Sequence, residues 1–144
     1  MITVKQILQD KQGRILTIKP DHTLYQALKV MADNNIGALV VVKDAKVIGM
    51  FAERDFVRNA VIDKKLSMDL KVKEIMSTLV CYVRPEQTID ECMALMTEKR
   101  TRHLPVLDGE TLVGIVSIGD VLKHTIEEKE FTIKNLENYI SGSL

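Results

Sequence analysis

The hydrophobic positions of the chain change from helical to extended spacing, and then back again. Apolar residues recur at helical spacing over 24–32, and two nearly continuous apolar runs follow at 38–42 and 47–51. A stripe with three- and four-residue spacing indicates an amphipathic helix, whereas short continuous runs are typical of buried strands. A short extended run at 15–18 precedes this region, and a second helix is predicted from about Glu53. The order predicted is therefore strand, helix, strand, strand, helix.

The same pattern returns, without a gap, when the sequence is shifted by 65 residues. Seven positions are identical between the copies: a helix breaker, a helix cap, core residues, a turn glycine and an aspartate at a helix start. These pairs are Pro20 and Pro85, Thr23 and Thr88, Met31 and Met96, Leu39 and Leu104, Val41 and Val106, Gly49 and Gly114, and Asp55 and Asp120. Each type has its own structural reason to recur, which indicates an internal structural repeat.

A short helical stripe opens each copy. The matching residues are Val4 with Val72, Ile7 with Ile75, and Leu8 with Met76. Here the shift is 68 residues, so the first copy contains three additional residues around Lys11 to Gly13. The insertion lies between the opening helix and the first strand.

A copy of about 60 residues can hardly bury both faces of a small sheet by itself, so the two copies are expected to pack on each other. With 46% hydrophobic residues, the 144-residue chain can bury one good core. We predict an α/β (α+β) fold of two β-α-β-β-α repeats related by pseudo-two-fold symmetry. The predicted boundaries are 1–63 for the first repeat with its N-terminal helical segment, 64–71 for a linker, 72–128 for the second repeat and 129–144 for a C-terminal helical extension.

Composition narrows the class of partner. Twenty basic and twenty acidic residues cancel, and no basic cluster indicates a nucleic-acid interface. Cys81 and Cys92 have no metal-ligand spacing and lie in apolar stretches, so we expect buried thiols and no metal site. No signal peptide and no apolar run of about 20 residues is found, which predicts a cytoplasmic protein without a membrane partner.

One stretch of the second copy carries candidate chemistry. Residues 114–120 predict a buried strand that leads directly into a helix, with Ser117 as its N-cap and Asp120 as the acidic member of a capping box. Both oxygens would face the unpaired backbone N–H groups that open a helix. On local sequence alone, these residues either cap a helix or bind a ligand whose phosphate sits at the helix start and whose hydroxyls reach Asp120.

These features together resemble those of a known family. The repeat order, the Gly-apolar-apolar-Ser-x-x-Asp strand and helix start at 114–120, and the preceding Arg-His-Leu-Pro-Val at 102–106 resemble a tandem pair of cystathionine-β-synthase (CBS) domains, a Bateman module. The resemblance covers about Val4 to Lys123. It implies a regulatory, energy-sensing module that binds AMP, ADP, ATP, NAD or S-adenosylmethionine in clefts between the repeats. AMP is the ligand we favour. The resemblance also implies that this chain is a stand-alone CBS pair, a homodimer and not an enzyme.

The resemblance assigns roles to individual residues. Ser117 would contact phosphate, Asp120 would bind the ribose hydroxyls, and the basic residues on the preceding strand would assist with phosphate. The purine edge would be read by backbone near the first strand and by residues before the second strand. The nucleotide-binding residues implied in this way are Ser117, Asp120, Arg102, His103, Lys11, Leu16, Thr17, Ile36, Gly37 and Ala38.

The first copy departs from the family pattern. It keeps Asp55 but has Ala52 at the position of the hydroxyl, and Gly37 and Ala38 where the second copy has its basic pair. We therefore expect two unequal sites. The weaker second site is predicted around Asp55, Arg54, Val80 and Thr101. Arg54 either points into that site or forms a surface ion pair, and common surface pairing favours the latter.

Two other function classes remain open. Ser117, His103 and Asp120 could form a catalytic triad. The spacing from Gly114 to Gly119 is, however, one residue longer than that of a nucleophile elbow, and Asp120 is better placed to cap the helix.

The other histidines, His22 and His124, lie in polar stretches that suggest solvent exposure.

The third class is a ligand-independent adaptor. An apolar stripe on the last helix, including Leu122, Ile126, Ile133, Leu136 and Ile140, would then form a homodimer contact or dock an unidentified regulated protein.

Overall fold

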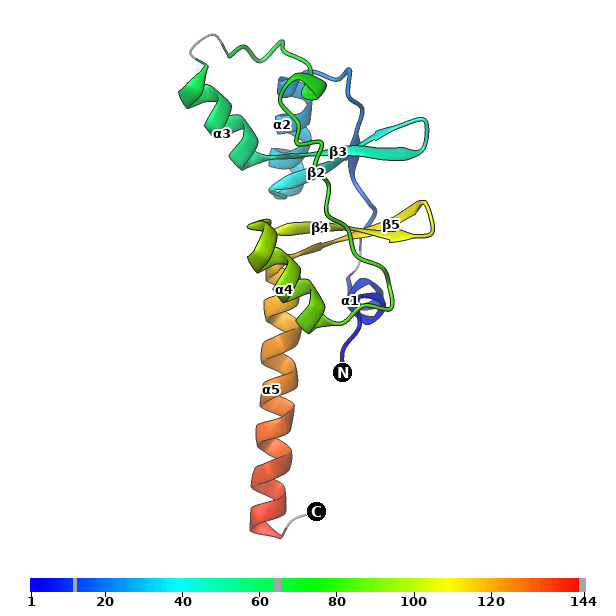
Figure 1. Cartoon of the computed structure of the whole chain (residues 1–144). Coiled ribbons are helices and arrows are strands. Elements are labelled where there is room, and N and C mark those ends of the chain that lie inside the picture. Colours follow the sequence, from blue (N-terminus) through cyan, green and yellow to red (C-terminus); the bar gives the residue numbers. More distant parts are fainter. Residues whose placement is uncertain (12, 64–65, 143–144) are drawn as a thin grey trace. The chain divides into compact units, whose positions relative to one another are not determined.

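The computed structural model describes residues 1–11, 13–63 and 66–142, so residues 64 and 65 of the predicted linker lie outside it. The fold is mixed α/β with β-α-β-β-α style repeats, as predicted (Figure 1). Its elements are α1 (Val4–Asp10), β1 (Thr17–Ile18), α2 (Leu24–Asn34), β2 (Ala38–Lys43), β3 (Lys46–Ala52), α3 (Glu53–Ile62), the 3-10 helix η1 (Val72–Glu74), α4 (Ile89–Lys99), β4 (His103–Asp108), β5 (Thr111–Ser117) and α5 (Ile118–Ser141). None of the described helices combines the length and apolar character needed to cross a membrane.

The elements group into two compact units, each described separately here. The α5 unit comprises Met1–Gly13, Val83–Val106 and Gly114–Leu144, and the α3 unit comprises Arg14–Tyr82 and Leu107–Val113. These units do not coincide with the sequence repeats, because the N-terminal segment belongs with the second copy. The domain boundaries drawn from the sequence stay a prediction.

The α3 unit is built on a three-stranded sheet in the order β1-β2-β3. Strand β1 runs parallel to β2, with Thr17 opposite Val40, and β2 runs antiparallel to β3. The buried core of this unit consists of Ile18, Leu24, Ala27, Met31, Leu39, Val41, Phe51 and Val72. The helical stripe and the two apolar runs recognised in the sequence therefore meet in one core.

The α5 unit repeats this construction with a shorter first strand. Strands β4 and β5 pair in a two-stranded sheet, and the expected strand before α4 is reduced to a parallel bridge between Val83 and Val106. Pro105 explains the difference: its carbonyl accepts a bond from the Val83 N–H at 2.9 Å, but proline has no N–H to donate in return. The buried apolar residues of the unit are Val4, Ile7, Val83, Ile89, Cys92, Met96, Leu104, Val106, Val116 and Val121.

The two cysteines differ in exposure. Cys92 is buried, as predicted, and burial raises the pKa of its thiol to about 11. Cys81 is only half-buried, so the expectation of burial was wrong for this thiol.

The opening segment of each copy packs on the core of the other copy. In the α5 unit, the N–H groups of Val4 and Lys5 donate to the carbonyls of Gln87 and Pro85. The α3 unit contains the equivalent pair of bonds, from Val72 to His22 and from Lys73 to Pro20. The opening segment of each copy thus belongs to the same unit as the core of the other copy, and we call these two stretches the exchanged segments.

Glycine lies where each exchanged segment meets a hairpin. A Cβ added to Gly114 would lie 2.6 Å from Leu8 Cδ2, and one added to Gly49 would lie 2.8 Å from both Met76 Sδ and the Ser77 carbonyl oxygen. Both distances are shorter than a carbon atom tolerates. The repeated glycine is therefore explained by the close approach of the segment from the other copy.

Candidate functional site

The start of α5 holds the capping box predicted from the sequence. The Asp120 N–H donates to Ser117 Oγ at 3.1 Å, and the Ser117 N–H donates to Asp120 Oδ2 at 2.9 Å. Ser117 has extended backbone angles, which end β5 and aim its hydroxyl at the first turn. The Arg102 carbonyl accepts a bond from the Ile118 N–H at 2.8 Å, and this bond joins the start of β4 to the helix start.

Lys11 adds a cation to this helix start. Its Nζ lies 2.9 Å from Asp120 Oδ2 and donates to the Ile115 carbonyl at 3.0 Å. Burial raises the pKa of Asp120, but bonds from Lys11 and Ser117 and the charge of Lys11 outweigh it, so the pKa lies below its usual value. The carboxylate is therefore held ionised in a half-buried setting.

The sequence had implicated Lys11 for its backbone near the purine, and its side-chain contact was not foreseen. Lys11 and Asp120 are 109 positions apart, and an ion pair between such distant residues leaves no periodic pattern in the sequence. The one available clue was the insertion around Lys11 to Gly13, which has no equivalent in the second copy. Gln12 of that stretch lies outside the described residues.

The residues predicted to bind nucleotide are divided between the two units. Those in the α5 unit are Ser117, Asp120, Arg102, His103 and Lys11, and those in the α3 unit are Leu16, Thr17, Ile36, Gly37 and Ala38. Within the α5 unit, the structure brings Lys11, Ser117 and Asp120 into contact. The Arg102 side chain is exposed and His103 is half-buried. That the two groups of residues together line one site stays a prediction.

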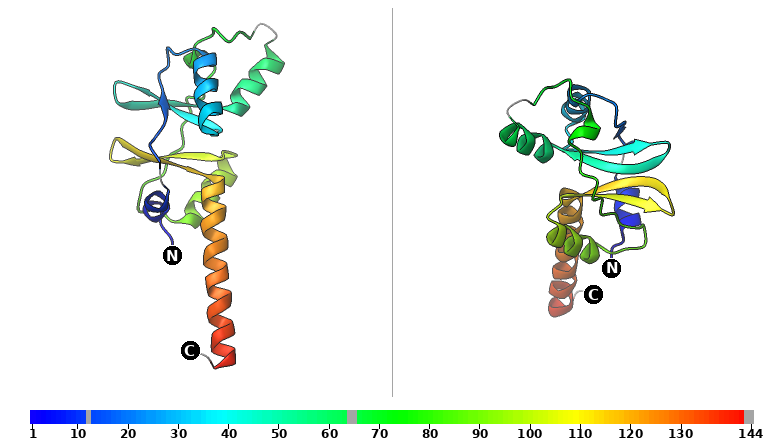
Figure 2. Two further views of the ribbon diagram at one scale, coloured as in Figure 1. Left: turned by 180° about the vertical axis from the view of Figure 1, so that it is seen from behind. Right: turned by 45° about the horizontal axis from the view of Figure 1, so that its top comes forward.

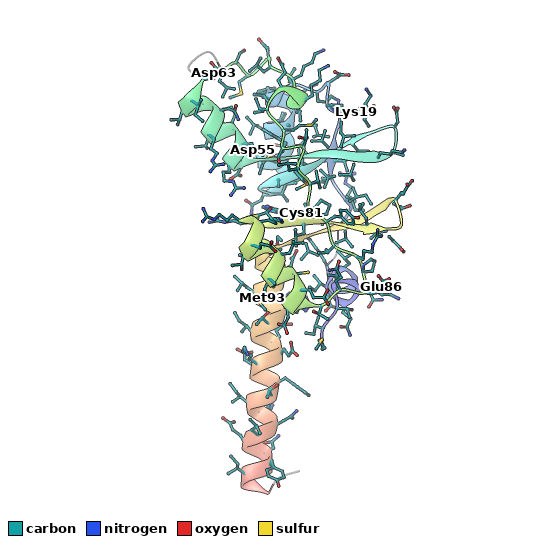
Figure 3. All side chains as sticks on the ribbon, in the orientation of Figure 1. Lys19, Asp55, Asp63, Cys81, Glu86 and Met93 are labelled. Atoms are coloured by element: carbon teal, nitrogen blue, oxygen red, sulfur yellow. The ribbon has the colours of Figure 1, made fainter. Side chains whose placement is uncertain are left out.

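The start of α3 is a reduced version of the α5 start. Ala52 has no hydroxyl, and among the described residues the Asp55 carboxylate accepts one bond, from the Ala52 N–H at 2.9 Å. No lysine or arginine of the described part of the chain forms an ion pair with Asp55, which Figure 3 labels at the start of α3. The Gly37 carbonyl receives the Glu53 N–H at 3.0 Å, the equivalent of the bond between Arg102 and Ile118. The backbone is thus repeated, whereas the polar side chains are not.

The other residues of the predicted weaker site are also divided. Arg54, which is exposed, and Val80, which is half-buried, belong to the α3 unit, and Thr101 belongs to the α5 unit. The Thr101 hydroxyl donates to the His103 carbonyl at 3.0 Å. A shared site around these residues stays a prediction.

The geometry does not form the catalytic triad considered above. Among the described residues, the hydrogen-bond partners of the Asp120 carboxylate are Lys11 and Ser117, and no imidazole is one of them. Ser117 Oγ bonds to the Asp120 N–H. His124, expected to be exposed, is instead buried in the α5 unit, with Nε2 3.9 Å from Asp10 Oδ2. The arrangement favours binding over nucleophilic catalysis.

Comparison with known proteins identifies the family. The CBS domain model matches residues 4–61 and 72–127. The chain belongs to the CBS domain family. Both members of its tandem pair are matched, and the helix starts compared above lie within the two matched segments.

Individual relatives agree with this assignment. The CBS domain-containing protein CBSX3, mitochondrial, of Arabidopsis thaliana is 35% identical over 97% of this chain and 72% of its own length. A solved protein with CBS domains from Burkholderia ambifaria MC40-6 is 47% identical, with a TM-score of 0.84 over 88% of this chain and 95% of that one. The CBS domain pair of protein MJ0100, in complex with 5′-methylthioadenosine and S-adenosyl-L-methionine, shares the fold at 23% identity, with a TM-score of 0.77 over 88% of this chain and 98% of that one.

Proposed function

We propose that this CBS pair is a regulatory module that binds an adenosine-containing nucleotide at the start of α5, with AMP as the favoured ligand and ADP, ATP, NAD or S-adenosylmethionine as alternatives. In this proposal the phosphate lies at the helix start, near Ser117 and Arg102, and Asp120 accepts hydrogen bonds from the ribose. The observation that carries it is the polar set at α5, a hydroxyl, an ionised carboxylate and a cation in contact.

The chemistry of each group suits the proposed ligand. A serine hydroxyl that already accepts a backbone bond can still donate its proton to a phosphate oxygen. The N-terminal end of a helix favours negative charge, and the guanidinium of Arg102 is a strong partner for phosphate. A carboxylate can accept from two vicinal hydroxyls, which a ribose provides.

The choice of an adenosine ligand has independent support in the family. The MJ0100 pair was solved with two adenosyl compounds, and a pair of the same fold can therefore hold an adenosyl group. At 23% identity this likeness concerns the fold alone. The assignment of residues in the present chain rests on its own α5 start.

A panel of nucleotides read by thermal unfolding tests the proposal. At a hundred times its dissociation constant, a ligand stabilises the folded state by about 2.7 kcal/mol, which is readily detected in a protein of this size. The panel comprises AMP, ADP, ATP, NAD and S-adenosylmethionine, with inosine monophosphate as a matched control for the purine edge. At least one adenosine compound is expected to raise the unfolding temperature. No shift with any of them would contradict the proposal.

The second candidate function is a dimerising adaptor, and the exposed face of α5 supports it. The C-terminal half of α5 continues beyond α4 and α1 of its own unit (Figures 1 and 2). Its apolar side chains are solvent-exposed, with Ile133 at 56%, Leu136 at 57% and Ile140 at 83%. An apolar stripe of this extent is typical of an interaction surface. We propose that it pairs with a second copy of the chain to form a homodimer.

Light scattering tests this second candidate. A dimer mass is expected at tens of micromolar protein, and deletion of residues 130–144 should weaken the dimer more than nucleotide binding. A monomer mass at that concentration would contradict the homodimer. Loss of binding from a truncated chain that stays dimeric would contradict the separation of the two roles.

A further inference from the structure

Lys11 lies at the proposed nucleotide site with a defined partner on each side. Its Nζ bonds to the Asp120 carboxylate and to the Ile115 carbonyl, so β5 and α5 both hold the ammonium group. We propose that Lys11 is a specificity-determining residue: it neutralises Asp120, and so allows the site to prefer phosphate-bearing nucleotides over the corresponding nucleosides. This inference rests on the proposed function.

The first step concerns charge. The carboxylate that suits a ribose also places a negative charge at the helix start, close to the proposed position of the phosphate. Two like charges placed close together repel each other, and more strongly in a partly buried setting than in water. A lysine at 2.9 Å from Asp120 Oδ2 cancels this charge. The helix end, Ser117 and Arg102 can then act on an anion without opposition from Asp120.

The second step concerns the carboxylate oxygens. The hydrogen bonds to Asp120 from described residues, those of Lys11 Nζ and the Ser117 N–H, both end on Oδ2. Oδ1 is therefore available to a ribose hydroxyl while Lys11 stays in place. An ammonium has three protons, and Lys11 uses two of them in its bonds to described residues, so the third can serve a phosphate oxygen. Binding is compatible with the ion pair.

The third step concerns how Lys11 is positioned. Lys11 is the C-cap residue of α1, and its N–H donates to the Ile7 carbonyl at 3.0 Å. Leu8 of the same helix packs against Gly114 at the hairpin that leads to α5. The backbone of Lys11 is thus fixed to the unit that carries Asp120. The packing of α1 therefore sets the position of the Lys11 backbone.

The α3 unit provides an internal comparison. Lys11 lies in the insertion that the second copy lacks, so no equivalent lysine approaches Asp55 among the described residues. The α3 start has also lost its hydroxyl. The cation of Lys11 therefore lies at the start of α5, which is the helix start that keeps the serine hydroxyl proposed to bind phosphate.

The test measures the affinities of AMP and adenosine for the full chain by calorimetric titration at one pH. Wild type is compared with Lys11→Met, Lys11→Arg and Lys29→Met. Lys29 pairs with Asp33 at 3.0 Å on α2, so its removal is a matched loss of a paired lysine elsewhere. The ratio of the adenosine to the AMP dissociation constant should fall about tenfold in Lys11→Met, the size of one charge-assisted hydrogen bond. Lys11→Arg and Lys29→Met should keep the wild-type ratio.

Each outcome decides the inference. An unchanged ratio in Lys11→Met would overturn it, as would an equal gain in affinity for both ligands, which would show that Lys11 blocks Asp120. Should Lys11→Met lose its folded signal, Lys11→Gln, which can still donate to Asp120 without charge, carries the same test. A wild-type chain that binds neither AMP nor adenosine overturns this inference. The thermal-unfolding panel of the other adenosine compounds then decides separately whether the proposed function stands.

Discussion

The starts of α5 and α3 share one backbone and differ in their side chains. Each follows the second strand of a hairpin, and each carries an aspartate whose carboxylate accepts a bond from the N–H of its N-cap residue at 2.9 Å. In each, the first helical N–H donates to the carbonyl of the residue just before the first strand of the hairpin. The α5 start adds Ser117 and Lys11, whereas the α3 start has Ala52 and no described cation on Asp55. The repeated aspartate is therefore explained by helix capping, and evidence for a ligand must come from the groups that differ.

The largest expected effect concerns the two repeated glycines. Gly49→Ala should cost about 3 kcal/mol and Gly114→Ala about 1 kcal/mol of the free energy of unfolding, the upper and lower ends for overpacking. The reason is that the new Cβ at residue 49 meets a backbone oxygen, that of Ser77, whereas at residue 114 it meets the end of the flexible Leu8 side chain. Urea denaturation of both variants measures the difference. Equal costs would contradict this account of the exchanged segments.

A smaller effect is expected when the caps are exchanged. Ser117→Ala should destabilise the chain by about 1 kcal/mol, and Ala52→Ser should stabilise it by up to a similar amount, because Asp55 already supplies the other half of the box. Ala52 has φ −117° and ψ 157°, close to the −97° and 162° of Ser117, so a serine fits without strain. Thermal or urea unfolding checks both substitutions. A destabilised Ala52→Ser chain would show that the two helix starts differ in more than their side chains.

The smallest effect is a change in acid stability. The pKa of Asp120 is lowered on folding, so the unfolded chain binds the proton more readily, and the stability from this group is present above its unfolded pKa of about 3.8 and lost as pH falls through the lower folded pKa. Lys11→Met removes a principal cause of that lowering. The loss of unfolding free energy between pH 5 and 3 should therefore be shallower in this variant than in wild type. An unchanged slope would indicate that Lys11 does not contact Asp120 in solution.

Local features of the site were predictable from the sequence, and long-range ones were not. The capping box at Ser117 and Asp120 is encoded within four residues, and the repeat identified its counterpart at Ala52 and Asp55. The contact with Lys11 joins segments far apart in the chain, and only folding brings them together. The same holds for the exchange of opening segments, because a helical stripe shows that a face is buried but not which core buries it.

Two further differences have similar causes. The strand expected before α4 is reduced to a bridge because Pro105 removes a donor from the partner strand, an effect that depends on which residues face each other. His124 was assigned to solvent from its polar neighbours. It follows buried Val121 by three residues, on the face of α5 that packs within its unit, so helical spacing outweighed local polarity.

The central claim is that the α5 start is the phosphate-binding, tighter site and that the α3 start is not. Calorimetric titration of AMP into wild type, Asp120→Asn and Asp55→Asn, each checked for folding, tests it most directly. Asp120→Asn should weaken binding about ten- to a hundredfold, the value of one or two charge-assisted hydrogen bonds, and Asp55→Asn should change it by less than about threefold. Wild-type affinity in Asp120→Asn together with loss of binding in Asp55→Asn would contradict the account and assign the site to the first copy.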